Sequence, residues 1–196
     1  LVLQANPALT WRDVKHVLIA SCTQVQAGDE GWTTNGAARA YHERLGFGLI
    51  DAARAVKIAQ GFAGVGDEAH AGGGVVSVNA PVPDNDLAGL TRSVSISDDL
   101  RVEHVEVTLN VAAPSVGQLR IELTSPSGTT GTLAEPRFDP APGYSGYVFT
   151  ATRFWGEPGG GTWSVRIADE AAGTLATWTS FSVDVYGHRH CPADAT

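Results

Sequence analysis

The chain has 196 residues, of which 43% are hydrophobic and 17% charged, and its formal net charge is −8. This composition predicts a folded globular protein of one or two domains rather than a disordered chain. The negative charge argues against nucleic acid as a partner, because phosphate binding requires clustered lysine and arginine. No apolar run is long enough for a membrane span.

Two short amphipathic helices are predicted in residues 1–62. The first begins at Thr10, because Thr10 and Asp13 form the T-x-x-D pattern typical of a helix start. Its core-facing positions follow at helical spacing: Val14, Val17, Leu18 and Ser21. The second begins after Asp51 as N-cap and ends at Gly61. Helices of this length cannot enclose a core by themselves, so their apolar faces predict a larger partner body.

A change of period separates this segment from the rest of the chain. Residues 63–74 are rich in glycine and alanine and are predicted to form a linker. From Val75 onwards apolar and polar residues alternate, which is typical of half-buried strands. The clearest alternation occurs at 105–111, 119–124, 163–168 and 181–186, and shorter strands are expected at 75–79, 91–97, 130–134 and 147–151. About eight short strands predict a mostly β fold, a jelly-roll-like β-sandwich, over residues 75–187, followed by a tail at 188–196.

Three runs in the first segment resemble one protease family. They are the stretch from Leu1 to Val14 with Thr10-Trp11-Arg12-Asp13, the run Trp32-Thr33-Thr34-Asn35-Gly36, and the stretch from His42 to Ala52 with Gly46-Phe47-Gly48-Leu49-Ile50-Asp51-Ala52. Their spacing is similar to that in subtilisin-like serine proteases of the kexin/furin branch, just after the nucleophilic serine. The resemblance implies that residues 1–62 are the C-terminal helices of an α/β catalytic domain. The serine would lie roughly three helical turns before Leu1.

The second segment resembles the P domain, which follows the catalytic domain in the same family. The resemblance rests on Leu123-Thr124-Ser125-Pro126-Ser127-Gly128-Thr129, Phe154-Trp155-Gly156-Glu157, Gly161-Thr162-Trp163, Gly173-Thr174-Leu175 and Val185-Tyr186-Gly187. One departure is Gln118, where many members carry an aspartate in an R-G-D-L run. The resemblance implies that this domain stabilises the catalytic domain and shifts its calcium and pH dependence.

The resemblance therefore implies a secreted serine endopeptidase whose catalytic triad lies upstream, so we assign no catalytic residue to this chain. The expected partners are the remainder of the catalytic domain and the protein or peptide substrates of the parent. The sequence contains neither a G-x-S-x-G nor a G-T-S run. The alternative is that the sandwich acts as an autonomous adhesion or substrate-targeting module without an enzymatic role.

Candidate binding residues are few. Asp84, Asn85 and Asp86 offer oxygen ligands for calcium, although the same residues are typical of a simple turn. Trp178 is predicted to be the exposed ring among the tryptophans and hence a candidate binding residue, whereas Trp155 and Trp163 are predicted to pack in the core. The family resemblance implies further calcium sites, with ligands mostly upstream.

The cysteines and the C-terminal histidines leave two alternatives open. His188-Arg189-His190-Cys191 offers ligands for a metal in the tail, but a complete site usually needs four. Cys22 and Cys191 could form one disulfide, but we favour two free thiols because the two residues fall in different predicted domains.

Overall fold

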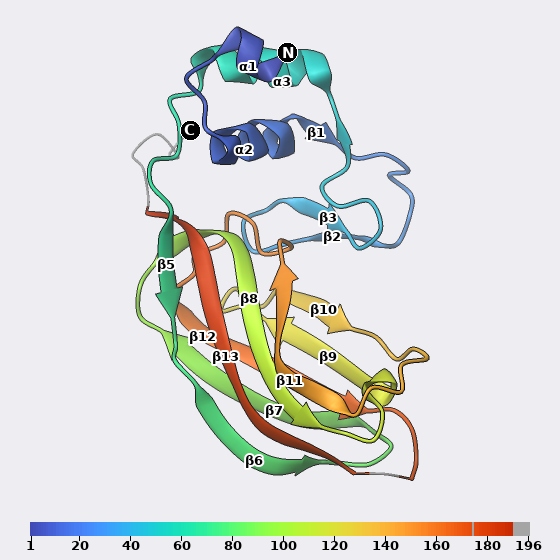
Figure 1. The fold of residues 1–196 in the computed structure, drawn as a ribbon. Coiled ribbons are helices and arrows are strands. Elements are labelled where there is room, and N and C mark those ends of the chain that lie inside the picture. Colours follow the sequence, from blue (N-terminus) through green and yellow to red (C-terminus); the bar gives the residue numbers. More distant parts are fainter. Residues whose placement is uncertain (174, 190–196) are drawn as a thin grey trace. The chain divides into compact units, whose positions relative to one another are not determined.

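The computed structural model describes residues 1–173 and 175–189, and these residues form two compact units (Figure 1). Unit 1 covers Leu1–Asp67 and unit 2 covers Glu68–Arg189. Among the described residues, no helix has the length and apolar character needed to cross a membrane.

Unit 1 contains three helices and two small strand pairs. The helices are α1 (Val2–Ala5), α2 (Trp11–Ser21) and α3 (Ala52–Gly61). The strand β1 (Cys22–Thr23) pairs with β4 (Leu49–Ile50), and β2 (Trp32–Thr34) pairs with β3 (Ala40–His42). The small core consists of Leu9, Val17, Ala55 and Ala59.

The helix boundaries in unit 1 follow the local signals of the sequence. Thr10 is the N-cap of α2 and forms a capping box with Asp13, and Asp51 is the N-cap of α3 through a bond from the Arg54 amide. Both predicted helix starts are confirmed. The backbone approaches closely at Gly48, which has φ +109° and where a Cβ would lie 2.3 Å from the Thr23 carbonyl oxygen.

Unit 2 is a sandwich of two antiparallel sheets, as predicted. One sheet has the order β10-β9-β12-β7, and the other has the order β11-β8-β13-β5, with β6 also paired to β13. The strands are β5 (Ala69–Gly72), β6 (Val76–Val82), β7 (Asp86–Ile96), β8 (Leu100–Ala112), β9 (Leu119–Thr124), β10 (Thr130–Ala134), β11 (Gly143–Ala151), β12 (Gly161–Asp169) and β13 (Ala176–Arg189). A single turn of 3-10 helix, Val116–Gln118, precedes β9.

The sandwich has a core of its own, built from alternate positions of both sheets. Fully buried side chains include Leu109, Ile121, Trp163 and Val183. Every buried member of this cluster belongs to unit 2, from Ala71 to Val185. The period-2 alternation of the sequence is therefore the alternation between core and solvent.

Two predicted boundaries are wrong. Residues 69–72, expected to be linker, form β5 and pair with Asp184 to Gly187. His188 and Arg189, expected to belong to the tail, continue β13 and pair with Arg101 and Leu100. In both cases small or polar residues adopt strand structure because the long strand β13 supplies backbone partners, which residue composition does not reveal.

Candidate functional site

Unit 1 has several exposed apolar side chains and one apolar hollow. A hollow of about 370 Å³ opens between its helices, and its walls are almost entirely aliphatic. Leu1, Leu3, Leu49 and Ile50 are all exposed, and Trp11 is 65% exposed. The hollow is lined by Leu1, Val2, Leu3, Val14, Leu18, Ile50, Ala52 and Ala55. Contiguous apolar surface of this kind typically marks an interaction site in a soluble protein.

Asp13 fixes the beginning of α2 and the chain that leaves α3. Its carboxylate accepts hydrogen bonds from the Thr10 amide at 2.8 Å and the Thr10 hydroxyl at 2.7 Å, and also from the Val65 amide at 2.9 Å. Burial alone would raise the pKa of Asp13, but the bonds from Thr10 and Val65 outweigh that effect and lower the pKa. Asp13 in the Thr10-Trp11-Arg12-Asp13 motif is thus a structural residue.

His42, in the run that resembles the protease family, is also structural. Its ring is buried, and Nδ1 accepts the amide hydrogen of Arg44 at 3.0 Å. Nε2 lies 3.3 Å from Oδ1 of Asp29, so the tautomer protonated at Nε2 directs this nitrogen toward the carboxylate. The bonds from the Gly31 amide and from His42 lower the pKa of Asp29. The His42 ring nitrogen therefore caps the backbone of the turn that follows it.

In unit 2, two of the sequence motifs meet at the buried carboxylate of Glu157. Oε2 accepts a hydrogen bond from the Ser125 hydroxyl at 2.6 Å, and Oε1 accepts one from the Thr129 hydroxyl at 2.5 Å. The Ser125 hydroxyl in turn accepts the Thr129 amide at 3.2 Å. Glu157 therefore joins the Leu123–Thr129 motif to the Phe154–Glu157 motif inside the domain.

The same Phe154–Glu157 segment is bonded to β8 through its backbone. The Gly156 amide donates to the Val102 carbonyl at 2.7 Å, and the Val102 amide donates to the Glu157 carbonyl at 3.0 Å. Phe154 and Trp155 are buried, and the Phe154 ring meets Trp163 edge-on at 5.2 Å. The prediction that Trp155 and Trp163 are core residues is confirmed.

The packing around Gly187 explains why the Val185-Tyr186-Gly187 motif ends in glycine. The β8–β13 ladder shifts register between Tyr186 and Gly187. At this point the backbones approach so closely that a Cβ on Gly187 would lie 1.9 Å from the Arg101 carbonyl oxygen. No side chain fits there without moving the strand.

The predicted calcium loop has the geometry of a turn. Both carboxylate oxygens of Asp84 accept the Gly173 amide at 3.1 Å, and Asp86 accepts the Ala88 amide at 2.9 Å. Asn85 has φ +49°, typical of a turn asparagine. Buried Asp169 lies near this loop, and its pKa is raised by desolvation and, to a smaller extent, by the charge of Asp84. In residues 1–173 and 175–189, these carboxylates do not form a cluster of three converging side-chain ligands, and their hydrogen bonds agree with the turn role.

The prediction that Trp178 is exposed is wrong. Its side chain has 0% exposure, its Nε1 donates to the Ser180 carbonyl at 3.2 Å, and its ring packs 5.0 Å from Phe181. Trp178 sits on β13, which is flanked by β6 and β8, so the alternation of the strand directs the ring into the core. The neighbouring threonine and serine residues made Trp178 look like part of an exposed segment in the sequence.

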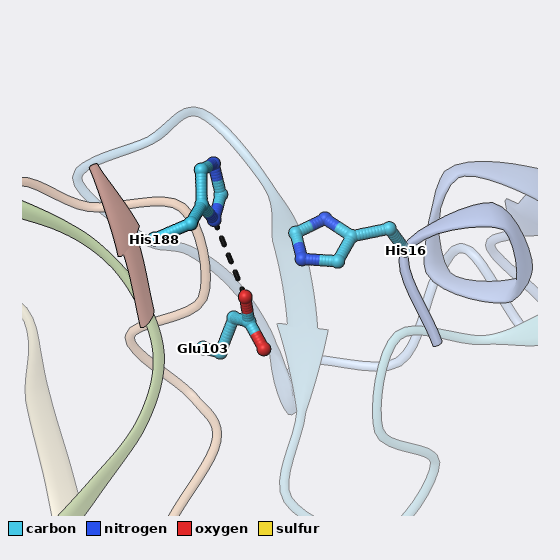
Figure 2. A group of neighbouring side chains, drawn as sticks. All are labelled: His16, Glu103 and His188. Atoms are coloured by element: carbon cyan, nitrogen blue, oxygen red, sulfur yellow. Dashed lines mark hydrogen bonds and ion pairs between the residues drawn. The ribbon is translucent and has the colours of Figure 1, made fainter. Parts of the chain in front are cut away.

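Of the predicted metal ligands near the C-terminus, the structure describes His188 but not His190 or Cys191. His188 Nδ1 lies 3.2 Å from Oε1 of Glu103 (Figure 2). Both side chains are buried and belong to neighbouring strands of unit 2. Cys22 is a free, half-buried thiol whose pKa is raised by burial. Residues His190 and Cys191 lie outside the described residues, and so does any bond between Cys22 and Cys191.

Comparison with known families and proteins identifies both segments. Residues 102–185 match the model of the proprotein convertase P-domain. The chain is 30% identical to Protease KEX1 of Kluyveromyces lactis over 95% of its length, and 32% identical to human Neuroendocrine convertase 2 over 91% of its length. It spans 26% and 30% of those relatives, respectively, which is well under half of each.

A solved structure shows the same fold. The crystal structure of a serine protease of Aeromonas sobria matches 95% of this chain with a TM-score of 0.87 and 24% sequence identity, and the match spans 42% of that chain. The sequence relatives cover the helical segment as well as the sandwich. The chain therefore corresponds to a P-domain-containing segment of the kexin/furin-like family, and unit 2 carries the proprotein convertase P domain.

Proposed function

We propose that this chain is the C-terminal part of a secreted kexin-like serine endopeptidase. Unit 1 completes the catalytic domain, the P domain stabilises that domain, and the catalytic triad lies upstream of Leu1. The parent enzyme would cleave peptide bonds of protein or peptide substrates by acyl-enzyme chemistry.

The single observation that carries the proposal is the exposed apolar hollow of unit 1. Its wall includes residues of helices α2 and α3, and its side chains Leu1, Leu3 and Ile50 are exposed. Removing apolar surface from water contributes about 25 cal/mol per Å². An occupant with the shape of a missing catalytic-domain core would therefore gain considerable free energy by filling this hollow.

The self-sufficient core of unit 2 supports its proposed stabilising role. The sandwich has a complete core, so it can serve as a rigid body against which a less stable domain is held. An inter-domain contact of roughly 1,000 Å² would be sufficient for a measurable effect, because folded domains are stable by only about 5–15 kcal/mol. Calcium belongs to this proposal, with its ligands mostly upstream of this chain.

The test is an activity assay on three proteins: the parent protease, the parent truncated after Asp67, and this chain alone. We expect secreted peptidase activity from the parent, loss of most secreted activity on truncation because the catalytic domain is destabilised, and no turnover by the chain alone. Turnover by the chain that a serine-directed inhibitor abolishes would contradict the proposal. Full secreted activity of the truncated parent would contradict the stabilising role.

The alternative is an autonomous adhesion or targeting module. Trp178, the candidate binding residue for that function, is buried and cannot contact a ligand at the surface. Retention of unit 2 on insoluble protein or glycan, without any effect of truncation on secreted activity, would favour this alternative.

A further inference from the structure

The strand β11 is an unprotected edge of the five-stranded sheet in unit 2. It pairs with β8 on one side, and in the described chain no other strand pairs with its other side (Figure 1, orange arrow). The register to β8 is regular from Tyr147 to Ala151. The backbone groups that point away from β8 along this stretch are therefore available to another strand.

No residue of β11 carries a charge, and its middle is apolar. The sequence Gly-Tyr-Ser-Gly-Tyr-Val-Phe-Thr-Ala contains neither an acidic nor a basic residue nor a proline. Tyr147 is 51% exposed and Val148 is 46% exposed. Edge strands are commonly protected by charged residues or proline, which prevent a second strand from pairing. The strand β11 has neither.

The other edge strands of unit 2 are protected. The strand β10 has five residues and a register shift, and β5 has four residues. The strand β6 contains Pro81 and a register shift near Asn79, and β7 carries Asp86 and Arg92. In β11 the single irregularity, between Tyr144 and Tyr147, lies in its first half and leaves the second half straight.

The two faces of β11 differ in a way that suits pairing. Tyr147 and Phe149 lie opposite the buried residues Leu109 and Val107, so they share the core face, where their rings pack 4.7 Å apart. Val148 and Thr150 lie on the outer face, opposite Thr108 and Glu106. A partner strand would therefore extend both the core layer and the outer surface without rearrangement.

We propose that β11 pairs antiparallel with β11 of a second copy of this chain, about a twofold axis at Phe149. An antiparallel edge is self-complementary, because the same strand reversed presents the same backbone groups. This axis places Val148 opposite the partner copy's Thr150 and Tyr147 opposite its Ala151. The two five-stranded sheets join into one ten-stranded sheet, and because β11 carries no charged residue, no like charges face each other directly across the contact.

The test compares the full chain with the double variant Val148→Lys/Thr150→Lys in sedimentation over a range of concentrations. The proposed axis places each new lysine directly opposite a lysine of the other copy, so we expect the dimer dissociation constant to rise at least about tenfold. The control is Leu87→Lys/Leu175→Lys, which adds the same charge at exposed leucines outside β11 and should leave association unchanged. Unaltered thermal unfolding at low concentration verifies that the variants fold.

Hydrogen exchange locates the contact in the same samples. We expect amides within 147–151 to exchange more slowly as concentration rises, whereas amides within 86–96 do not change. A monomer at all concentrations, or a dimer insensitive to the lysine pair, would overturn the proposal. If the chain stays monomeric and a nine-residue Thr-Val repeat peptide protects 147–151, the edge accepts a foreign strand and the second copy is the wrong occupant.

Discussion

Replacing Glu157 by alanine should destabilise unit 2 by about 3–5 kcal/mol, because a buried carboxylate that holds two motifs together is lost. Glu157 has 0% exposure and accepts the hydroxyl hydrogens of Ser125 and Thr129. Without it, both hydroxyls lose a charged acceptor and a cavity remains. Thermal unfolding of the chain, followed by near-ultraviolet circular dichroism of the buried tryptophans, should show a Tm lower by roughly 10–20 °C.

The matched control for this variant is Glu135→Ala. Glu135 is 73% exposed, and its contact with Arg120 is 3.8 Å long. Surface ion pairs of this kind contribute little, so we expect a change within about 0.5 kcal/mol. The conservative variant Glu157→Gln keeps the shape of the side chain and one acceptor oxygen. Its Tm should lie between the Tm values of Glu157→Ala and Glu135→Ala. Equal Tm values for Glu157→Ala and Glu135→Ala would show that the motif contact does not stabilise the domain.

Replacing Gly187 by alanine should destabilise unit 2 by about 3 kcal/mol, through a backbone clash rather than a lost bond. The added Cβ would lie 1.9 Å from the Arg101 carbonyl oxygen, at the register shift of the ladder between β8 and β13. A carbonyl in a central ladder cannot move aside as the end of a flexible side chain can. Denaturant unfolding should show a lower midpoint with an unchanged slope.

Gly74→Ala separates the clash from the general effect of adding a side chain. Gly74 has φ +74° but no neighbouring atom within 4 Å of the added Cβ, so only the left-handed backbone conformation is penalised. We expect a loss of about 1 kcal/mol from that strain. A Gly187→Ala variant as stable as Gly74→Ala would mean that the ladder adjusts easily around Arg101.

The sequence predicted the elements with strong local signals. The capping residues Thr10 and Asp51 mark the helix starts, and the alternation at 119–124 and 163–168 marks strands with one face in the core. The features that the sequence did not predict depend on pairing between strands that are distant in the sequence. The strand β5 forms because β13 offers it a partner, and Trp178 is buried because its strand lies between two others.

The functional residues were harder to foresee. Ser125 and Glu157 were recognised as parts of two separate family motifs, but only the fold brings the hydroxyl to the carboxylate across 32 residues. Asp84 and Asp86 illustrate the opposite case, because turn residues and calcium ligands have the same composition. Their bonds from the Gly173 and Ala88 amides agree with the turn role, and a sequence pattern cannot show such bonds.

The central claim is that the apolar faces of α2 and α3 are shaped to be covered by the rest of a catalytic domain. Hydrogen exchange measured on this chain and on the full-length parent protease tests it most directly. We predict fast exchange of amides within 11–21 and 52–61 in the chain alone and exchange slowed by orders of magnitude in the parent, with the strands β8 and β13 equally protected in both. Equal protection of the two helices in the chain and in the parent would contradict the claim.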